Sequence, residues 1–388
     1  GCFSAGASFF ENTHGRATWG THETCLTNNL GWTARSLLLA TADSSWADRI
    51  ERVCLNAGIG SVTKDFKALQ YFSGPNQIQL ETGNFGWSGI YEPGYHTWCC
   101  AASVNRDLPN YIGSMWMRYG QSGLAAALYG PCQVTTEVGE KKQEITIIER
   151  TEFPFGETIE FELQCESKVK FDLKLRIPSW AKDASLKING TVTNHTLIPG
   201  RFLSIDHEYS NGDILTLVLP MQTTASTWPH NGLAFERGPL VYSLRIDAEK
   251  KLLRTGPKGE KMPLGDEFPA YEMYPKSDWN YAWDVDVDKL DEEVKVIKNP
   301  LTDNPWDDEG QPPVSLEVPA RKIENWKLIL DKKGQPKMAS DDSGGFAPEL
   351  PDEDAMLLAD KPEIITLVPL GATCLRMTIL PSAQGGIE

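Results

Sequence analysis

The sequence has 388 residues, of which 40% are hydrophobic, and it includes 12 tryptophans. This is the composition of a folded globular protein with room for about two or three domains. The 53 acidic and 37 basic residues give a formal net charge of −16. That surplus argues against nucleic acid and anionic membrane surfaces as partners, since both bind basic patches. No run of about 18 apolar residues is present, so no transmembrane helix is predicted.

The chain begins Gly1-Cys2-Phe3 without a methionine, and we expect that a further segment precedes it. No signal peptide is visible, although the preceding segment could carry one. The 8 cysteines are unevenly spaced, which is not the pattern of a disulfide framework. A reducing compartment, or a site that protects a few thiols, fits better. A cytoplasmic and a periplasmic location in a bacterium are both compatible with this pattern, and the sequence does not indicate an oligomeric state.

Helical spacing of apolar residues dominates residues 1 to 121. Three helices are expected: one around residues 26 to 38, one around 46 to 57 capped by Ser44 or Ser45, and one from Asp107-Leu108-Pro109 to Gly120. The connection before the third helix, NFGWSGIYEPGYHTW, is rich in glycine and aromatic residues. Its length is typical of a loop that carries function.

From about residue 123 the apolar pattern changes to a period of two, which predicts β-strands. The predicted strands lie at 159 to 165, 171 to 177, 214 to 219, 233 to 246 and 364 to 381. The turn signal Ser210-Asn211-Gly212-Asp213 precedes the third of them. Residues 248 to 355 are charged and proline-rich and are interpreted as surface insertions. Short alternating strands with frequent turns are typical of antiparallel β-sandwiches.

The adjacent cysteines Cys99 and Cys100 allow three interpretations: two unrelated thiols, a strained vicinal disulfide, or a metal site. The stretch GTHETC adds Glu23 and Cys25 just before a predicted helix. Three cysteines and a glutamate form a four-ligand set suited to Zn²⁺, which favours thiolates in tetrahedral geometry. The sequence contains neither a CxxC pair nor HExxH, so neither a zinc finger nor a standard metalloprotease helix is indicated.

The stretch Glu23-Thr24-Cys25, followed by Cys99-Cys100 and then Arg106, resembles glycoside hydrolase family 127, the β-L-arabinofuranosidase family. The resemblance extends through LPNYIGSMWMRYGQSGLAAALYGPCQV, LRIPSW, FERGPLVYSL, DWNYAW and LVPLGATCLRMTILP. It implies that residues 1–122 are the C-terminal part of an incomplete (α/α)6-barrel catalytic domain. It further implies a β-sandwich domain at 123–228 and a second β-sandwich domain with long insertions at 229–388.

The family carries Zn²⁺ on one glutamate and three cysteines, which match Glu23, Cys25, Cys99 and Cys100, with Cys99 at the position of the nucleophile. A free thiol has a pKa of about 8.5 and is mostly protonated at neutral pH, so a metal is needed to hold the thiolate. The ligand set and the metal would carry a formal charge of about −2, which keeps the sulfur electron-rich. Attack on a furanosidic sugar would give a thioglycosyl-enzyme that water hydrolyses with net retention.

A retaining glycosidase also needs an acid to protonate the leaving oxygen. The resemblance places this acid sixteen residues before Glu23, where Ala7 stands. Three explanations stay open. Glu11, one helical turn further on, is the preferred replacement; His14 or His22 could titrate near neutral pH; or ordinary hydrolysis is lost and the metal site serves another use.

Five residues near the cysteine pair are candidate substrate-binding residues, because aromatic rings can line a sugar subsite: Trp87, Tyr91, Tyr95, His96 and Trp98. The rival interpretation of these residues is packing in the core of the barrel. At the level of function, the rival to a carbohydrate-cleaving enzyme is a non-catalytic carbohydrate-binding or scaffold relative with a structural zinc site.

Overall fold

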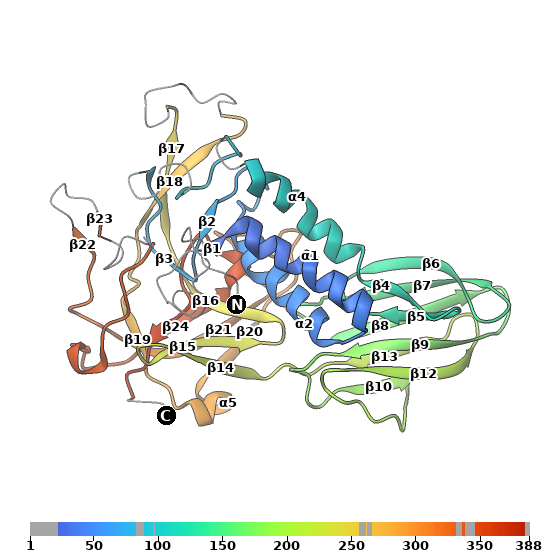
Figure 1. Cartoon of the computed structure of the whole chain (residues 1–388). Helices are drawn as coiled ribbons and strands as arrows, with labels where there is room; N and C mark the ends of the chain where they lie inside the picture. The colour runs from blue at the N-terminus through green and yellow to red at the C-terminus, as the bar shows by residue number, and fades with distance from the viewer. Residues whose placement is uncertain are drawn as a thin grey trace. The chain divides into compact units, whose positions relative to one another are not determined.

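The computed structural model describes residues 22–82, 89–95, 98–255, 261, 266–330, 336–337 and 346–384 (Figure 1). The chain divides into two compact units. Unit 1 takes in the described parts of Gly1–Leu30, Leu55–Arg106 and Thr223–Glu388, and unit 2 comprises Gly31–Cys54 and Asp107–Gln222. Strands predominate in the described residues, where they form several sheets, and helices are few.

The helices are α1 (Thr24–Thr41), α2 (Ser45–Arg52), which continues as the π-helix η1 (Val53–Gly58), α4 (Trp98–Ile112) and the short α5 (Leu290–Glu293). The first two predicted helices are confirmed. The third was predicted to run from Asp107 to Gly120, and both ends are wrong. It already begins at Trp98, ends at Ile112 and contains Pro109 in its last turn. Residues 116–119 then form a strand.

The stretch between η1 and α4 lies in a region that was expected to be largely helical up to the predicted loop at 84–98, and that expectation is wrong for residues 61–81. It contains the two-residue strands β2 (Phe72–Ser73) and β3 (Asn76–Gln77) and isolated bridges such as Leu69 with Glu92. Glycine and proline punctuate this stretch, and its backbone groups pair with distant segments instead of with a helix of their own.

Unit 2 contains two sheets, one ordered β11-β10-β13-β8-β7-β6 and the other β12-β9-β5-β4. The strands are β4 (Trp116–Tyr119), β5 (Gly123–Ala126), β6 (Cys132–Val138), β7 (Gln143–Thr151), β8 (Thr158–Cys165), β9 (Val169–Ile177), β10 (Ser185–Ile188), β11 (Thr191–Val192), β12 (Arg201–Tyr209) and β13 (Ile214–Val218). The strands predicted at 159 to 165 and 171 to 177 are confirmed as β8 and β9. Their alternating apolar side chains are buried, and the ring of Phe161 on β8 lies edge-on to that of Trp116 on β4, with centroids 5.8 Å apart. The apolar faces of the two sheets therefore share one core.

The predicted turn before β13 is present, but the hairpin prediction is wrong, because β12 pairs with β9 and β13 pairs with β8 and β10 in the other sheet. Gly212 has φ +84, a left-handed conformation that favours glycine. The Asp213 carboxylate accepts a hydrogen bond of 2.7 Å from the backbone N–H of Ser210, which closes the turn.

Unit 1 contains a ten-stranded sheet with the order β14-β15-β16-β24-β21-β19 and further pairings by β3, β20, β25 and β26. The strands are β14 (Thr223–Trp228), β15 (Gly232–Arg237), β16 (Leu240–Ile246), β19 (Tyr281–Trp283), β20 (Lys295–Lys298), β21 (Val314–Lys322), β24 (Glu363–Pro369), β25 (Leu375–Met377) and β26 (Leu380–Pro381). The strands predicted at 233 to 246 and 364 to 381 are confirmed. The interpretation of 248 to 355 as surface insertions is wrong for β21, which lies in the interior of the sheet although it contains Pro319.

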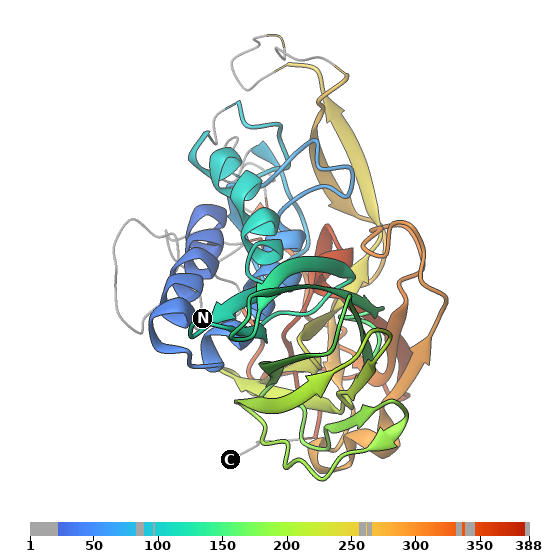
Figure 2. The same ribbon diagram turned by 90° about the vertical axis from the view of Figure 1, so that its right-hand side faces the viewer.

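The remaining elements are shorter: β1 (His22–Glu23), the hairpins β17 (Ala248–Leu253) with β18 (Ala270–Pro275) and β22 (Ile329–Leu330) with β23 (Pro336–Lys337), and the 3₁₀ helices η2 (Val287–Lys289), η3 (Glu353–Ala355) and η4 (Leu370–Ala372). The β17–β18 hairpin, yellow in Figure 2, projects from the ten-stranded sheet of unit 1. Among the described residues no helix is both long and apolar enough to span a membrane.

A buried ion-pair network in unit 2 joins α2 to the four-stranded sheet. Arg176 on β9 is fully buried and contacts Asp48 at 2.5 Å and the buried carboxylate of Glu51. Its Nε donates to the carbonyl of Ala127 at 2.5 Å. Burial raises the pKa of Glu51 to about 8, although the charge of Arg176 opposes this shift. The guanidinium is therefore the group that compensates two carboxylates.

The variant Arg176→Met is expected to lower the free energy of unfolding by about 3–5 kcal/mol, because it leaves Glu51 buried without its cation. The matched control is Arg150→Met, the same substitution at a half-exposed arginine that pairs with Glu162. Its expected cost is about 0–1 kcal/mol. Urea unfolding of both variants measures the difference, and equal costs would contradict the assigned role of Arg176.

Candidate functional site

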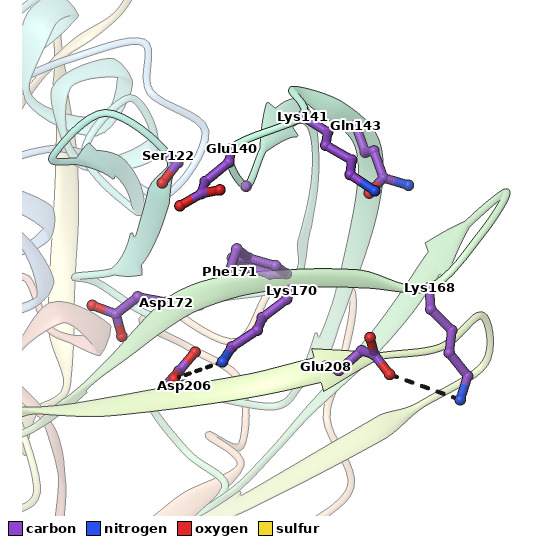
Figure 3. Close-up of a pocket in the computed structure, with 11 residues that line it drawn as sticks. Ser122, Glu140, Lys141, Gln143, Lys168, Lys170, Phe171, Asp172, Asp206 and Glu208 are labelled. Carbon is purple, nitrogen blue, oxygen red and sulfur yellow. Dashed lines mark ion pairs between the residues drawn. The ribbon is translucent and has the colours of Figure 1, made fainter.

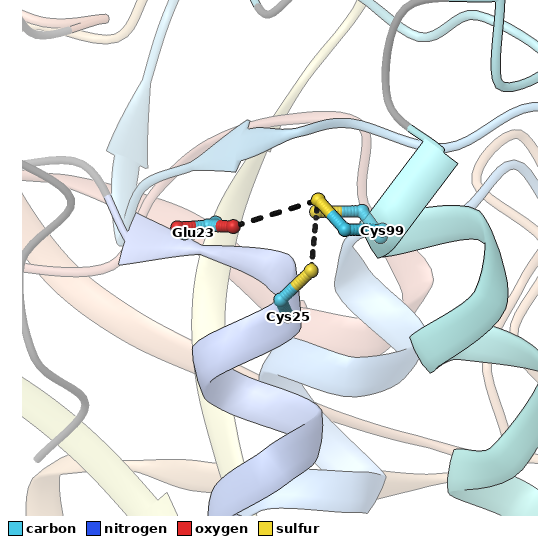
Figure 4. A group of neighbouring side chains, drawn as sticks. Glu23, Cys25 and Cys99 are labelled. Carbon is cyan, nitrogen blue, oxygen red and sulfur yellow. Dashed lines mark hydrogen bonds between the residues drawn. The ribbon is translucent and has the colours of Figure 1, made fainter.

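Four side chains that are distant in sequence converge in unit 1: Glu23, Cys25, Cys99 and Cys100 (Figure 4). Their ligand atoms all lie within 4.8 Å of one another. The Sγ atoms of Cys25 and Cys100 are 3.1 Å apart, and those of Cys99 and Cys100 are 4.0 Å apart. The Sγ of Cys99 lies 3.8 Å from Oε1 of Glu23. This grouping requires the first turn of α1 and the first turn of α4 to meet.

Backbone pairing fixes the first half of the cluster. Strand β1 pairs with β2 so that Glu23 lies opposite Phe72. At the start of α1, the backbone N–H of Thr24 donates to the carbonyl of Tyr71 at 2.9 Å, and the Thr24 hydroxyl donates to the carbonyl of Gln70 at 2.8 Å. The strand-to-helix junction between Glu23 and Cys25 is therefore held by the segment 70–73.

A buried carboxylate fixes the second half. The Oε2 atom of Glu92 accepts hydrogen bonds from the backbone N–H groups of Gly94 and Tyr95, at 2.9 and 2.6 Å. The backbone of Glu92 also exchanges two hydrogen bonds with Leu69, whose side chain packs beside Cys25 and Cys100. These bonds fix the turn that precedes α4 and with it the position of Cys99 and Cys100.

Two electrostatic effects shift the pKa values of the thiols in opposite directions. Cys25 belongs to the first turn of α1, and Cys99 and Cys100 to the first turn of α4, where the partial positive charge of a helix N-terminus favours thiolates. Burial acts in the opposite direction: it raises the pKa of Cys100 to about 12 and that of Cys25 further. Without a bound cation the two buried thiols keep their protons at neutral pH.

The four residues differ sharply in exposure. Cys25 and Cys100 are buried and pack with Val62 and Leu69, whereas Cys99 is exposed. Cys99 is therefore the thiol of this cluster that a molecule from solvent can reach. All three are free thiols in the structure, so Cys99 and Cys100 do not form the vicinal disulfide that the sequence left open.

The cluster fits a divalent metal ion. Tetrahedral coordination with metal–sulfur bonds of about 2.3 Å places ligand atoms about 3.8 Å apart. The contacts of Cys99 with Cys100 and with Glu23, at 4.0 and 3.8 Å, are close to that value, and the contact between Cys25 and Cys100 is shorter. Among the described residues, no other group of histidine, cysteine and acidic side chains has its ligand atoms close enough to one another to hold a metal.

Tyr71 lies beside the cluster and was not singled out from the sequence. Its pKa is raised by burial first, and then by a hydrogen bond to Glu23 and the neighbouring negative charges. A phenol that donates to a ligating carboxylate fixes the orientation of that ligand. Glu92 was missed as well; its only local signal is the following Pro93-Gly94 turn sequence.

The other predicted site residues are placed less completely. Glu11, His14, Trp87 and His96 lie outside the described residues, and Trp98 is described only as the first residue of α4. Tyr95 packs against Ile90 and Ala270. Tyr91 is buried, and its hydroxyl donates to the carbonyl of Gly60 at 2.9 Å, so packing in the core is the correct interpretation of that residue. His22 is half-buried on β1, where successive side chains point to opposite faces, away from Glu23.

Unit 2 has a surface groove of about 410 Å³ that contains none of these residues (Figure 3). It is lined mainly by charged side chains of neighbouring strands. Lys170 pairs with Asp206 at 3.2 Å, and Lys168 lies 3.9 Å from Glu208. Both pairs are diagonal, because Asp206 lies opposite Asp172 and Glu208 lies opposite Lys170, each two positions beyond the lysine that it contacts. Such diagonal cross-strand pairs are ordinary on a solvated sheet face.

Comparison with known families bears directly on the convergent cluster. Residues 1–112 match the model of the β-L-arabinofuranosidase GH127 catalytic domain, and residues 123–221 match that of the GH127 middle domain. Together the two matches cover more than half of the chain, and the first contains all four residues of the cluster. The chain belongs to glycoside hydrolase family 127.

Solved structures of similar fold are consistent with this membership. One described as a glycoside hydrolase has a TM-score of 0.68 and 20% identity, over 95% of this chain and 53% of that chain. A GH127 β-arabinofuranosidase has a TM-score of 0.69 and 19% identity, over 98% and 52% of the two chains. A GH127 β-L-arabinofuranosidase from Geobacillus stearothermophilus T6 has a TM-score of 0.64 and 20% identity, over 94% and 50%.

This GH127 chain thus spans about half the length of the solved structures that it matches. At this level of identity they establish the fold alone. No curated protein sequence matches the chain.

The variant Cys100→Ser is expected to abolish stoichiometric metal binding, because it replaces a buried thiolate ligand by a hydroxyl that stays protonated. Elemental analysis of the purified protein by mass spectrometry measures the metal content. Cys165→Ser, which changes a partly buried thiol at the end of β8, is the control and should retain about one metal per chain. Equal metal content in both variants would contradict the site.

The variant Tyr71→Phe is expected to weaken metal binding by about 10- to 100-fold, the usual effect of losing a group that orients a ligand. Competition with a chromogenic chelator measures the affinity. Tyr119→Phe, an exposed tyrosine of unit 2, is the control and should leave the affinity unchanged. A result in which the two variants bind metal equally well would show that the phenol of Tyr71 has no such role.

Proposed function

We propose that this chain contributes the nucleophile and metal centre of a retaining glycoside hydrolase that acts on a β-L-arabinofuranoside-like sugar. The observation that carries the proposal is the convergence of three thiols and one carboxylate, of which Cys99 alone is exposed. The cluster lies within the match to a GH127 catalytic domain, and two of the structures of similar fold are described as arabinofuranosidases.

Zinc is the metal that we propose for the site. Three sulfur ligands and one oxygen ligand favour a thiophilic ion without geometric preferences from d-electrons, and magnesium or calcium would prefer an all-oxygen set. Glu23, Cys25, Cys99 and Cys100 would hold it. When bound, zinc lowers the pKa of its thiol ligands and keeps them as thiolates at neutral pH.

Cys99 is proposed as the nucleophile because it combines exposure with membership of the cluster. In the first step its sulfur attacks the anomeric carbon, and the bond from that carbon to the leaving oxygen breaks as the oxygen takes up a proton. In the second step water attacks the same carbon and gives one proton to the carboxylate that lost its proton in the first step, while the carbon–sulfur bond breaks and the thiolate is released. Two inversions give net retention, as in glycosidases that use a carboxylate nucleophile.

Buried Cys25 and Cys100 hold the geometry in this scheme. Their packing with Val62 and Leu69 leaves no access for a sugar from that side. Glu23 faces Cys99, and the hydrogen bond from Tyr71 orients its carboxylate. The sulfur of Cys99 is therefore positioned by the protein on one side and accessible to a substrate from solvent on the other.

The acid that protonates the leaving group is proposed to be Glu11, because Ala7 stands at the corresponding family position. The same substitution is the observation that favours the alternative, a non-catalytic carbohydrate-binding or scaffold relative in which the metal is structural. The domain boundaries remain proposals as well: the end of an (α/α)6 barrel at 1–122, a β-sandwich at 123–228 and a second at 229–388. The two family matches, which end at residue 112 and begin at residue 123, support the first boundary.

The test is hydrolysis of an aryl β-L-arabinofuranoside by the protein and its variants. Cys99→Ser is expected to lower kcat/KM by about 10³-fold or more, the usual effect of removing a nucleophile. Glu11→Gln should lower the rate mainly for poor leaving groups, because good ones need no proton. Cys165→Ser is the control and should retain activity.

A second measurement separates enzyme from scaffold without relying on turnover. A sugar-directed electrophile should add one label per chain to Cys99, detected by peptide mass spectrometry, and none after Cys99→Ser. A protein that binds zinc stoichiometrically but shows neither labelling nor hydrolysis would be the scaffold relative. Activity that survives Cys99→Ser would remove the nucleophile assignment.

A further inference from the structure

Unit 1 has a cavity whose lining contains none of the residues of the metal cluster. It has a volume of about 310 Å³ and is enclosed by the loop Thr63–Asp65, the β17–β18 hairpin and the acidic loop 304–309. Cys374 closes its inner side and is 4% exposed. The volume is at the lower end of the range of about 300–1,000 Å³ for small-molecule sites.

Three polar atoms of the lining have no hydrogen-bond partner among the described residues: the hydroxyl oxygen of Tyr271 and the Oδ2 atoms of Asp65 and Asp307. The hydroxyl of Tyr271 makes no hydrogen bond to any described residue, and its ring is half-buried at the wall of the cavity. The contacts that the Asp65 carboxylate makes with Thr63 and Lys67, at 2.7 and 3.1 Å, are both to its Oδ1 atom. Asp307 likewise uses only Oδ1, which accepts from the backbone N–H of Glu309 at 3.1 Å.

The cations of the lining are already paired. The Nζ of Lys250 lies 3.0 Å from Asp308 and 2.7 Å from Glu309. The Nζ of Lys64 donates to the carbonyls of Ile59 and Val62, both at 3.1 Å. No ammonium is left over for a phosphate or a carboxylate, and the unpaired carboxylates would repel either group.

A divalent cation is also a poor match for this cavity. Asp65 belongs to a different loop from Asp307, Asp308 and Glu309. Within the described part of the chain, acidic, cysteine and histidine ligand atoms come close enough to hold a metal only at Glu23, Cys25, Cys99 and Cys100. What remains is an aromatic wall with a free hydroxyl and two carboxylate oxygens that can accept hydrogen bonds. A neutral sugar is complementary to these groups. Its vicinal hydroxyls can donate hydrogen bonds to the carboxylates, and the apolar face of its ring can pack on the aromatic ring.

We propose that this cavity is a second, non-catalytic binding site for a neutral, single-ring sugar. The Tyr271 ring packs against one face of the sugar, while the free oxygens of Asp65 and Asp307 accept its hydroxyls. The site acts independently of Cys99, so it does not rest on the proposed hydrolytic activity.

The site is pre-formed, which reduces the entropy lost on binding. The backbone N–H of Tyr271 donates to the carbonyl of Tyr91 at 2.9 Å, which ties β18 to the body of unit 1. The loop that carries Asp65 is closed by bonds from Thr63 to Ala68, at 2.9 Å, and from Phe66 to Thr63, at 2.8 Å. A sugar therefore meets walls that need no large rearrangement.

Hydrogen–deuterium exchange by mass spectrometry locates binding directly, with D-xylose and L-arabinose as probes and D-galacturonate as the anionic control. The neutral pentoses should slow exchange in peptides covering 63–68 and 304–310, at millimolar concentrations, and galacturonate should not. Tyr271→Ala should raise the apparent Kd by about tenfold, through loss of the aromatic contact. Tyr271→Phe keeps the ring and should raise it by about threefold to tenfold, through loss of one hydrogen bond.

Matched controls decide the interpretation. Cys99→Ser and Tyr119→Ala should leave the protection at 63–68 and 304–310 unchanged, since neither residue lines the cavity. The proposal is overturned if saturating pentose gives no protection there, or if Tyr271→Phe and Asp307→Asn bind as the parent protein does. It is also overturned if Ca²⁺ or spermidine produces the same protection and the pentoses do not.

Discussion

The meeting of two helix N-termini is the constraint on which the candidate site depends. Three thiols and a carboxylate repel one another once they are ionised, and two of the thiols are buried, so their approach must be enforced by the surrounding backbone. The pairing of β1 with β2 holds the start of α1, and the bonds of Glu92 hold the turn before α4. A cation at the centre would turn this repulsion into attraction.

The three thiols of the cluster are chemically identical, and their different burial gives them different roles. Cys25 and Cys100 are enclosed by apolar side chains and serve the geometry, whereas Cys99, adjacent to Cys100 in the sequence, faces solvent. Neighbouring residues in a helix point about 100° apart, so the first turn of α4 can bury one thiol and expose the next. A single adjacent pair thereby supplies both a structural ligand and the proposed nucleophile.

In both units, buried charged groups that are fully paired within the protein have a structural role, and polar groups without a partner are the ones that a ligand can bind. In unit 2, the buried guanidinium of Arg176 is surrounded by Asp48, Glu51 and a backbone carbonyl. In unit 1, Lys250 and Lys64 are compensated in a similar way. The neighbouring Tyr271 hydroxyl is not, and an uncompensated polar group at a cavity wall is what a ligand can use.

The sequence by itself determined the local patterns and the composition of the site. Alternation fixed β8 and β9, and the unusual Glu-x-Cys and Cys-Cys stretches indicated the four residues that converge. Only the tertiary structure decided what depends on distant partners. Helix α4 begins nine residues before its predicted start at Asp107, and β21 runs through Pro319 inside a sheet. Tyr71 carries no local signal, because its role arises from a contact with Glu23, far along the chain. Glu92 is followed by a turn sequence, but its pairing with Leu69 and its burial are properties of the folded chain that no short stretch encodes.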